Sequence, residues 1–164
     1  MARPEFCFAE PGDADELIAL EGGLFPKEEA ATTESIRARI RAFPKHFWLL
    51  KQDGAIAAYV NGALTHERDL LDPMYSDTSF HHEDGSWQML FGVGCARAFQ
   101  RQGLASMLMS HVVEDCRRRG YAGVVLACHE ALIPFYSLFG FMDEGLGASV
   151  HGGSAWHQMR IAFN

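Results

Sequence analysis

The chain has 164 residues, 48% of them hydrophobic and 21% charged. This length and composition predict a single globular domain over residues 1–164 and exclude a disordered chain, which buries too little apolar surface to fold. The formal net charge of −7 argues against binding of nucleic acid, because phosphate contacts need a clustered positive surface. A small cationic molecule is a more compatible partner.

The cysteines and histidines do not have the spacing of a metal site. Four cysteines are widely separated, so we expect reduced thiols in the core, and His81-His82-Glu83 lacks a second ligand group at zinc-site spacing. No apolar run resembles a signal peptide or is long enough to span a bilayer. We expect a cytoplasmic monomer or homodimer with no metal and no membrane partner.

Two helices are predicted in the first third of the chain. The first begins at a capping-box pattern formed by Asp13 and Glu16, and Gly22-Gly23 is expected to end it. The second begins at Thr32 or Thr33, either of which can cap it.

Alternating or continuous apolar runs predict the strands. Gln52-Asp53-Gly54 is a hairpin signal between the second and third runs, and the polar segment 65–86 is expected to be a long functional or mobile loop. The strand candidates cover residues 5–9, 46–50, 55–64, 87–95, 124–128, 141 onward and 156–163.

A strong amphipathic helix follows the strand at 87–95. Its apolar residues Leu104, Leu108, Val112 and Cys116 recur at helical spacing, and the next strand is fully apolar. This strand, helix and strand predict a βαβ unit with a right-handed crossover inside a mixed sheet, which is an α/β (α+β) fold. A short helix is expected around residues 134–138.

The turn before that helix is a candidate anion site. Gly103 and Ala105 would allow a ligand to approach the backbone, and the first N–H groups of a helix have no intrahelical partner. The alternative is a tight connection that uses Gly103 only for a positive φ. On this segment alone the two interpretations are about equally favoured.

This turn also resembles a known family. Gln100-Arg101-Gln102-Gly103-Leu104-Ala105 is similar to the Gln/Arg-x-x-Gly-x-Gly/Ala motif of the GNAT superfamily of N-acetyltransferases. Within it, residues 125–141, which contain Ala-Leu-Ile-Pro-Phe-Tyr and end in Phe-Gly-Phe, resemble the arylalkylamine (serotonin) N-acetyltransferases. The similarity is strongest from about residue 87 to residue 141.

The resemblance implies a fold and an acetyl-CoA site. The fold would be a mixed, mostly antiparallel sheet of about six to seven strands, flanked by about four helices, with a splayed central strand pair that holds CoA. The strand backbone at Val93, Gly94 and Cys95 would pair with the pantetheine amides. The pyrophosphate would bind the N–H groups of Arg101, Gln102, Gly103, Leu104, Ala105 and Ser106.

The resemblance also implies a reaction, the transfer of an acetyl group to a small primary amine. Tyr136 takes the position of the tyrosine that protonates the departing thiolate. The paired histidines that carry the amine proton in the vertebrate enzymes are replaced here by Met89 and Phe91. His151 is the first candidate to replace them, followed by His129 or Glu130 and by Glu83 or His82 on the long loop. Water is a further possibility.

The expected acceptor pocket is aromatic and apolar, which suits a hydrophobic or arylalkyl amine. By the same resemblance it contains Phe25, Met89, Phe91, Ala127, His151, Ser154 and Trp156.

Three other functions are weighed against amine transfer. A hydrolase with Cys128-His129 or Cys7 as nucleophile is disfavoured, because adjacent residues of a strand point to opposite faces. A non-catalytic acyl-CoA sensor is the more serious alternative, since a fold and a cofactor site do not guarantee turnover. An acetyltransferase for protein amines ranks lower, because the long loop and the aromatic residues suggest an enclosed pocket.

Overall fold

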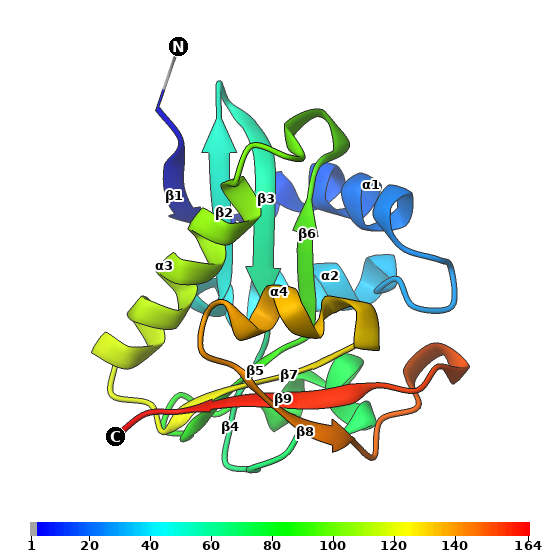
Figure 1. Cartoon of the computed structure of the whole chain (residues 1–164). Coiled ribbons are helices and arrows are strands. Elements are labelled where there is room, and N and C mark those ends of the chain that lie inside the picture. The colour runs from blue at the N-terminus through cyan, green and yellow to red at the C-terminus, as the bar shows by residue number, and fades with distance from the viewer. Residues whose placement is uncertain (1–2) are drawn as a thin grey trace.

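The structure is a computed structural model that describes residues 3–164. Within this range two sheets, ordered β1-β2-β3-β6 and β4-β5-β7-β9-β8, meet where β5 passes into β6 (Figure 1). The strands are β1 (Glu5–Phe8), β2 (Phe47–Gln52), β3 (Ala55–Asn61), β4 (Leu64–Thr65), β5 (Trp87–Leu90), β6 (Gly92–Cys95), β7 (Gly123–Cys128), β8 (Met142–Leu146) and β9 (His157–Ala162).

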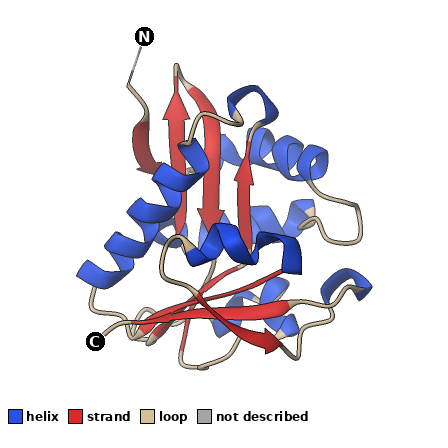
Figure 2. Ribbon diagram, in the orientation of Figure 1, coloured by secondary structure: helices blue, strands red, loops and turns tan. Residues whose placement is uncertain are grey.

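Helices cover both faces of the four-stranded sheet (Figure 2). Because side chains alternate along a strand, Leu49 and Tyr59 pack with α1 and α2, whereas Leu50 and Val60 pack with α3. The helices are α1 (Ala14–Leu24), α2 (Thr33–Ala42), α3 (Leu104–Arg118) and α4 (Ile133–Ser137). The expected GNAT-like mixed α+β fold is confirmed.

The predicted hairpin is confirmed at β2 and β3. These strands pair antiparallel, and Asp53 and Gly54 between them have φ values of 54° and 80°. Two consecutive positive φ values give the turn whose twist matches the flanking strands. The βαβ unit is also confirmed, because α3 connects the β5–β6 segment to β7, which pairs parallel with β5.

The single strand predicted over residues 87–95 is wrong, because the chain changes sheets at Phe91. β5 pairs with β7 from Trp87 to Leu90, whereas β6 pairs with β3. The Phe91 N–H donates to the Asn61 carbonyl at 2.7 Å, although Asn61 is already opposite Gly92. Two residues opposite one is a β-bulge, which bends the strand. This additional division contributes to a strand count above the expected six to seven.

The start of α1 differs from the expected capping box. The Asp13 carboxylate accepts hydrogen bonds from Lys51 and from the Glu10 N–H, and Glu16 accepts one from the Ile56 N–H. Both side chains therefore tie α1 to neighbouring segments. The second prediction is confirmed, because the Thr32 side chain caps α2 by accepting from the Ser35 N–H at 3.1 Å.

Gly22 and Gly23 lie inside α1, which continues to Leu24, so the predicted helix end is wrong. A methyl group added at Gly22 would meet no atom within 4 Å. Alanine has the better helix propensity, so Gly22→Ala should stabilise the fold by about 0.5–1 kcal/mol. Urea denaturation measures this. Gly120→Ala, at a φ of 82°, should have the opposite sign, and a loss of stability in Gly22→Ala would contradict the prediction.

Candidate active site

The two sheets separate between β6 and β7, and one edge of β6 therefore has no strand partner among residues 3–164. The Ala96 N–H donates to the Ala57 carbonyl at 2.8 Å, which fixes the alternation along β6. The backbone groups of Gly94 therefore face β3, and those of Val93 and Cys95 face the open edge. The Cys95 carbonyl accepts a hydrogen bond from the Gln100 side-chain amide at 3.1 Å.

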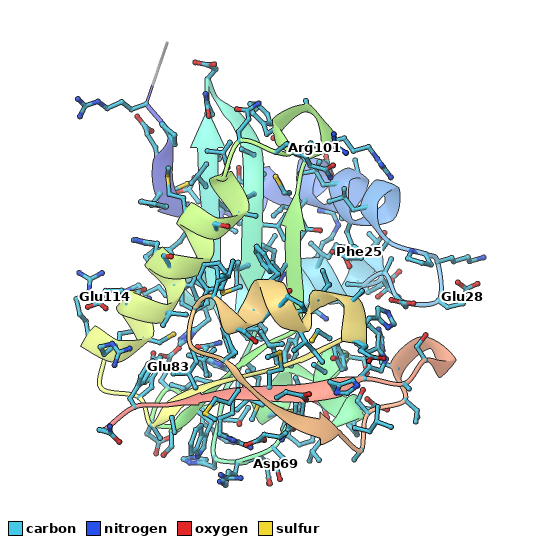
Figure 3. The ribbon with its side chains drawn as sticks, in the orientation of Figure 1. Phe25, Glu28, Asp69, Glu83, Arg101 and Glu114 are labelled. Atoms are coloured by element: carbon cyan, nitrogen blue, oxygen red, sulfur yellow. The ribbon has the colours of Figure 1, made fainter. Side chains whose placement is uncertain are left out.

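The turn at residues 100–106 presents free N–H groups beyond the end of that edge. Arg101 and Gly103 both have positive φ values, 64° and 75°, and Gly103 is the N-cap of α3. The Met107 N–H donates to the Gly103 carbonyl at 3.0 Å, so the N–H groups of residues 104–106 precede the intrahelical ladder. In Figure 3 Arg101 lies at the end of the molecule where this turn joins β6 to α3.

A cavity of about 120 Å³ lies where β6 and β7 diverge. It is formed by β5–β6, β7, α4, the residues after α1 and the segment before β9. This is smaller than the roughly 300–1,000 Å³ of typical pockets for drug-sized ligands, which favours a small acceptor. The predicted site residues that line it are Phe25, Phe91, Val93, Ala127, Tyr136, His151 and Trp156.

Tyr136 lies on α4 with a side chain that is only 7% exposed and lines this cavity. Burial, and secondarily the negative charge that Cys128 acquires when its thiol ionises at high pH, raises the pKa of the Tyr136 hydroxyl well above the ordinary value. The hydroxyl is therefore protonated at neutral pH and can donate a proton to an anion formed in the cavity.

Glu29 contacts two histidines in the wall of the cavity. Its carboxylate lies 2.8 Å from Nε2 of His129, and its carbonyl oxygen lies 3.0 Å from Nε2 of His151. His129 also stacks on Trp156 at 4.1 Å between ring centroids, and the Trp156 indole donates to the His151 carbonyl at 2.7 Å. Glu29 was missed by the sequence analysis, because nothing in a single sequence connects residues 100 positions apart.

Two of the predicted acceptor-pocket residues are not among those that line the cavity. Met89 is fully buried and packs with Val125, Leu70 and Met74. The Ser154 hydroxyl lies 3.5 Å from the Glu29 carboxylate but is not one of the lining groups. Phe91 packs against the same cluster as Met89, but it lies two residues further along the chain, where the two sheets separate, and it lines the cavity.

Cys128 and His129 do not form a nucleophile and base pair. The Cys128 thiol contacts the Met159 sulfur at 3.6 Å, whereas the His129 ring turns to Glu29. Burial raises the pKa of the Cys128 thiol to about 11, so the reactive thiolate is scarce at neutral pH. Only two of the four thiols, Cys116 and Cys128, are buried as expected of core residues; Cys7 is partly exposed.

A second histidine cluster lies away from the cavity, where His46 meets His81 and Glu83. The sequence argument about metals overlooked His46. Nδ1 of His81 lies 3.0 Å from the Leu64 N–H, which makes it the acceptor, and Nε2 lies 2.7 Å from the Glu83 carboxylate. Neutral His81 therefore carries its proton on Nε2, which prevents metal binding at that atom. His82 belongs to an exposed group with His66 and Asp84.

Comparisons with known proteins agree on the family of folds. A model described as the acetyltransferase (GNAT) family matches residues 14–141. The serotonin N-acetyltransferase of Mesocricetus auratus is 26% identical over 162 residues, covering 96% of this chain and 77% of the relative.

Two solved structures align over almost their whole length. The loading GNATL domain of CurA from Lyngbya majuscula has a TM-score of 0.84 at 17% identity, covering 98% of each chain. The GphF GNAT-like decarboxylase in complex with isobutyryl-CoA has a TM-score of 0.78 at 19% identity, covering 96% of this chain and 98% of that one. Within residues 3–164, no helix combines the length and apolar character needed to cross a bilayer.

Proposed function

The chain belongs to the GNAT family of acetyltransferases, whose members catalyse acyl-CoA-dependent N-acetylation, and we propose that it acetylates a small primary amine, with an arylalkylamine as the candidate acceptor. One observation carries the proposal: the cavity between β6 and β7 is lined both by the protonated Tyr136 and by the Glu29–His129 pair. The aromatic side chains of Phe25, Phe91 and Trp156 support an arylalkyl group.

The proposed cosubstrate, acetyl-CoA, lies along the open edge of β6. The backbone groups of Val93 and Cys95 bind the pantetheine amides, and the N–H groups of residues 101–106 bind the pyrophosphate, as expected for a helix N-terminus. We propose that these two sets of contacts together direct the thioester into the cavity beside Tyr136.

The proposed reaction is direct transfer. The neutral amine attacks the thioester carbonyl carbon, the C–N bond forms, and the C–S bond breaks as the tetrahedral intermediate collapses. Tyr136 donates its proton to the CoA thiolate, and a base in the cavity takes the proton that the amine nitrogen loses. No covalent enzyme intermediate is needed.

We propose His129 as this base, with His151 as the second candidate. The Glu29 carboxylate lies 2.8 Å from the His129 ring and orients it, whereas the His151 ring contacts the Glu29 carbonyl at 3.0 Å. His129→Gln should lower kcat/KM by about 10- to 100-fold, and His151→Gln should lower it less. If His151→Gln causes the larger loss, the assignment is reversed.

Thiol release tests the function itself. Acetyl-CoA is incubated with a panel of arylalkylamines, alkylamines and peptides with free N-termini, and CoA release is measured with a thiol reagent. Release with small amines supports the proposal, and release with peptides alone favours a protein acetyltransferase. Because the same fold serves a decarboxylase, binding of acetyl-CoA without release would instead favour a non-acetylating protein such as a sensor.

A further inference from the structure

Arg39 is a buried cation whose donors are mostly unused. It lies on α2 with a side chain that is 3% exposed. One terminal nitrogen donates to the Asn61 side chain at 2.9 Å and the other to the Tyr75 carbonyl at 2.8 Å. Its Nε has no hydrogen-bond partner within residues 3–164. A guanidinium has five N–H donors, so a buried one with two hydrogen bonds is unusual.

The charge of Arg39 also lacks a contact partner, because no carboxylate among residues 3–164 forms an ion pair with it. Burial lowers the pKa of Arg39 to about 10, and Glu21 opposes this without touching it. The Glu21 carboxylate is occupied, since its oxygens accept hydrogen bonds from the Tyr59 hydroxyl at 2.6 Å and the Ala31 N–H at 2.9 Å. Buried charges in proteins are normally paired, so a bound anion would compensate the buried positive charge of Arg39.

Arg39 lines a cavity of about 100 Å³ that adjoins the candidate active site. The guanidinium lies 5.1 Å from the centre of the Phe91 ring, which is part of the active-site wall. The two cavities share the residues Glu21, Glu29, Tyr75, Phe91 and His151. Tyr136 and Val93, which belong to the proposed thioester end, line only the first cavity, so the second cavity extends the acceptor end of the site.

We propose that Arg39 binds a substrate carboxylate, so that the acceptor is an amine that also carries a carboxylate, as an amino acid does. This deepens the function proposed above and rests on it. A carboxylate provides the bidentate partner that a guanidinium prefers and uses donors that Asn61 and Tyr75 leave free. The acceptor amine then points from the Arg39 cavity towards His129 and the thioester.

Matched acceptors test the proposal on the unaltered protein. Phenylalanine with phenethylamine, and leucine with 3-methylbutylamine, differ only in the carboxylate, and the ratio of their kcat/KM values with acetyl-CoA measures its contribution. We expect the carboxylated member of a pair to be favoured by about 10- to 100-fold, the effect of one charge-assisted hydrogen bond. If amines without a carboxylate are acetylated equally well or better in every pair, this inference fails while the acetyltransferase function stands.

Variants of α2 assign the effect to Arg39. Arg39→Gln should reduce the ratio to near 1, whereas Arg41→Gln, which removes an exposed charge from the same helix, should preserve it. Should Arg39→Gln fail to fold, Arg39→Lys keeps the charge and should give an intermediate ratio. A ratio unchanged in folded Arg39→Gln would overturn the assignment.

A second arm locates the source of the carboxylate. Malonyl-CoA and succinyl-CoA carry one on the acyl chain, and their turnover is compared with that of acetyl-CoA using phenethylamine as acceptor. If Arg39 is needed for a preference for malonyl-CoA or succinyl-CoA over acetyl-CoA, and the acceptor pairs show no preference, then the carboxylate that Arg39 binds belongs to the acyl group and not to the acceptor. If no acyl-CoA turns over at all, the acetyltransferase function fails, and calorimetry of the same acceptor pairs with the CoA-bound protein decides whether Arg39 recognises a carboxylate.

Discussion

Replacing Tyr136 with phenylalanine should lower kcat by about 100- to 1,000-fold while the affinity for acetyl-CoA changes little, because positioned general acids contribute on this scale. The variant removes one oxygen from a buried ring that packs edge-on against Phe135 and Phe141, so the packing remains. Stopped-flow or steady-state thiol release gives kcat, and calorimetry gives the affinity for CoA.

Tyr121→Phe is the matched control. Tyr121 lies before β7, outside the cavity, where its hydroxyl accepts a hydrogen bond from Arg119 at 3.2 Å. Loss of the Tyr121 hydroxyl should leave kcat within about twofold of the wild type, since no reacting group is touched.

Because burial raises the pKa of Tyr136, deprotonation of the Tyr136 hydroxyl should not produce a high-pH limb in the profile of kcat below about pH 10. Full activity in Tyr136→Phe would remove the tyrosine from the mechanism.

The second large effect is expected at the turn before α3. Gly103→Val should weaken CoA binding by about 100-fold, or roughly 2.7 kcal/mol, because a branched side chain at the N-cap blocks the pyrophosphate from the free amides. No atom of the described part of the chain lies within 4 Å of a methyl group added there, so the fold has room for it. Calorimetry is carried out with CoA and with pantetheine, which lacks the phosphate groups. The difference between the two affinities separates the contribution of the pyrophosphate from that of the strand edge.

Gly120→Val separates ligand blocking from backbone strain. Gly103 and Gly120 flank the same helix, have φ values of 75° and 82°, and are both open to solvent, so valine should destabilise the fold to a similar extent. Only Gly103→Val should weaken CoA binding. If both variants lose affinity equally, the loss reflects a general disturbance of α3.

The sequence predicted the segments in which local chemistry and packing agree. The Asp53-Gly54 hairpin, the α2 cap at Thr32 and the amphipathic α3 have local signals strong enough to fix them. The helix end at Gly22 was mispredicted because tertiary packing overrides a glycine that costs only about 1 kcal/mol.

Seven of the sixteen residues that line the cavity followed from the resemblance, but the charged groups of this cavity and of the adjoining one did not. Glu29 and Arg39 come from segments before the central strands, and neither belongs to a recognisable motif. The contact of Glu29 with His129, and the approach of Arg39 to Phe91, depend on how α1, α2 and the strands pack, which periodicity does not encode. Met89 was placed in the pocket by position, but it lies two residues before Phe91 and is covered by Val125, Leu70 and Met74.

The additional residue opposite Asn61 directs β6 away from the line of β5. Phe91 and Gly92 are both opposite Asn61, and such an additional residue bends the strand and increases its local twist. Removing Gly92 would restore one unbroken ladder in which Val93 follows Phe91, so Gly94 would still face β3 and the same amides would still face the open edge. We expect the deletion to straighten the segment and so to narrow the gap between β6 and β7, which would weaken CoA binding through the direction of the strand and not through the facing of its peptide groups.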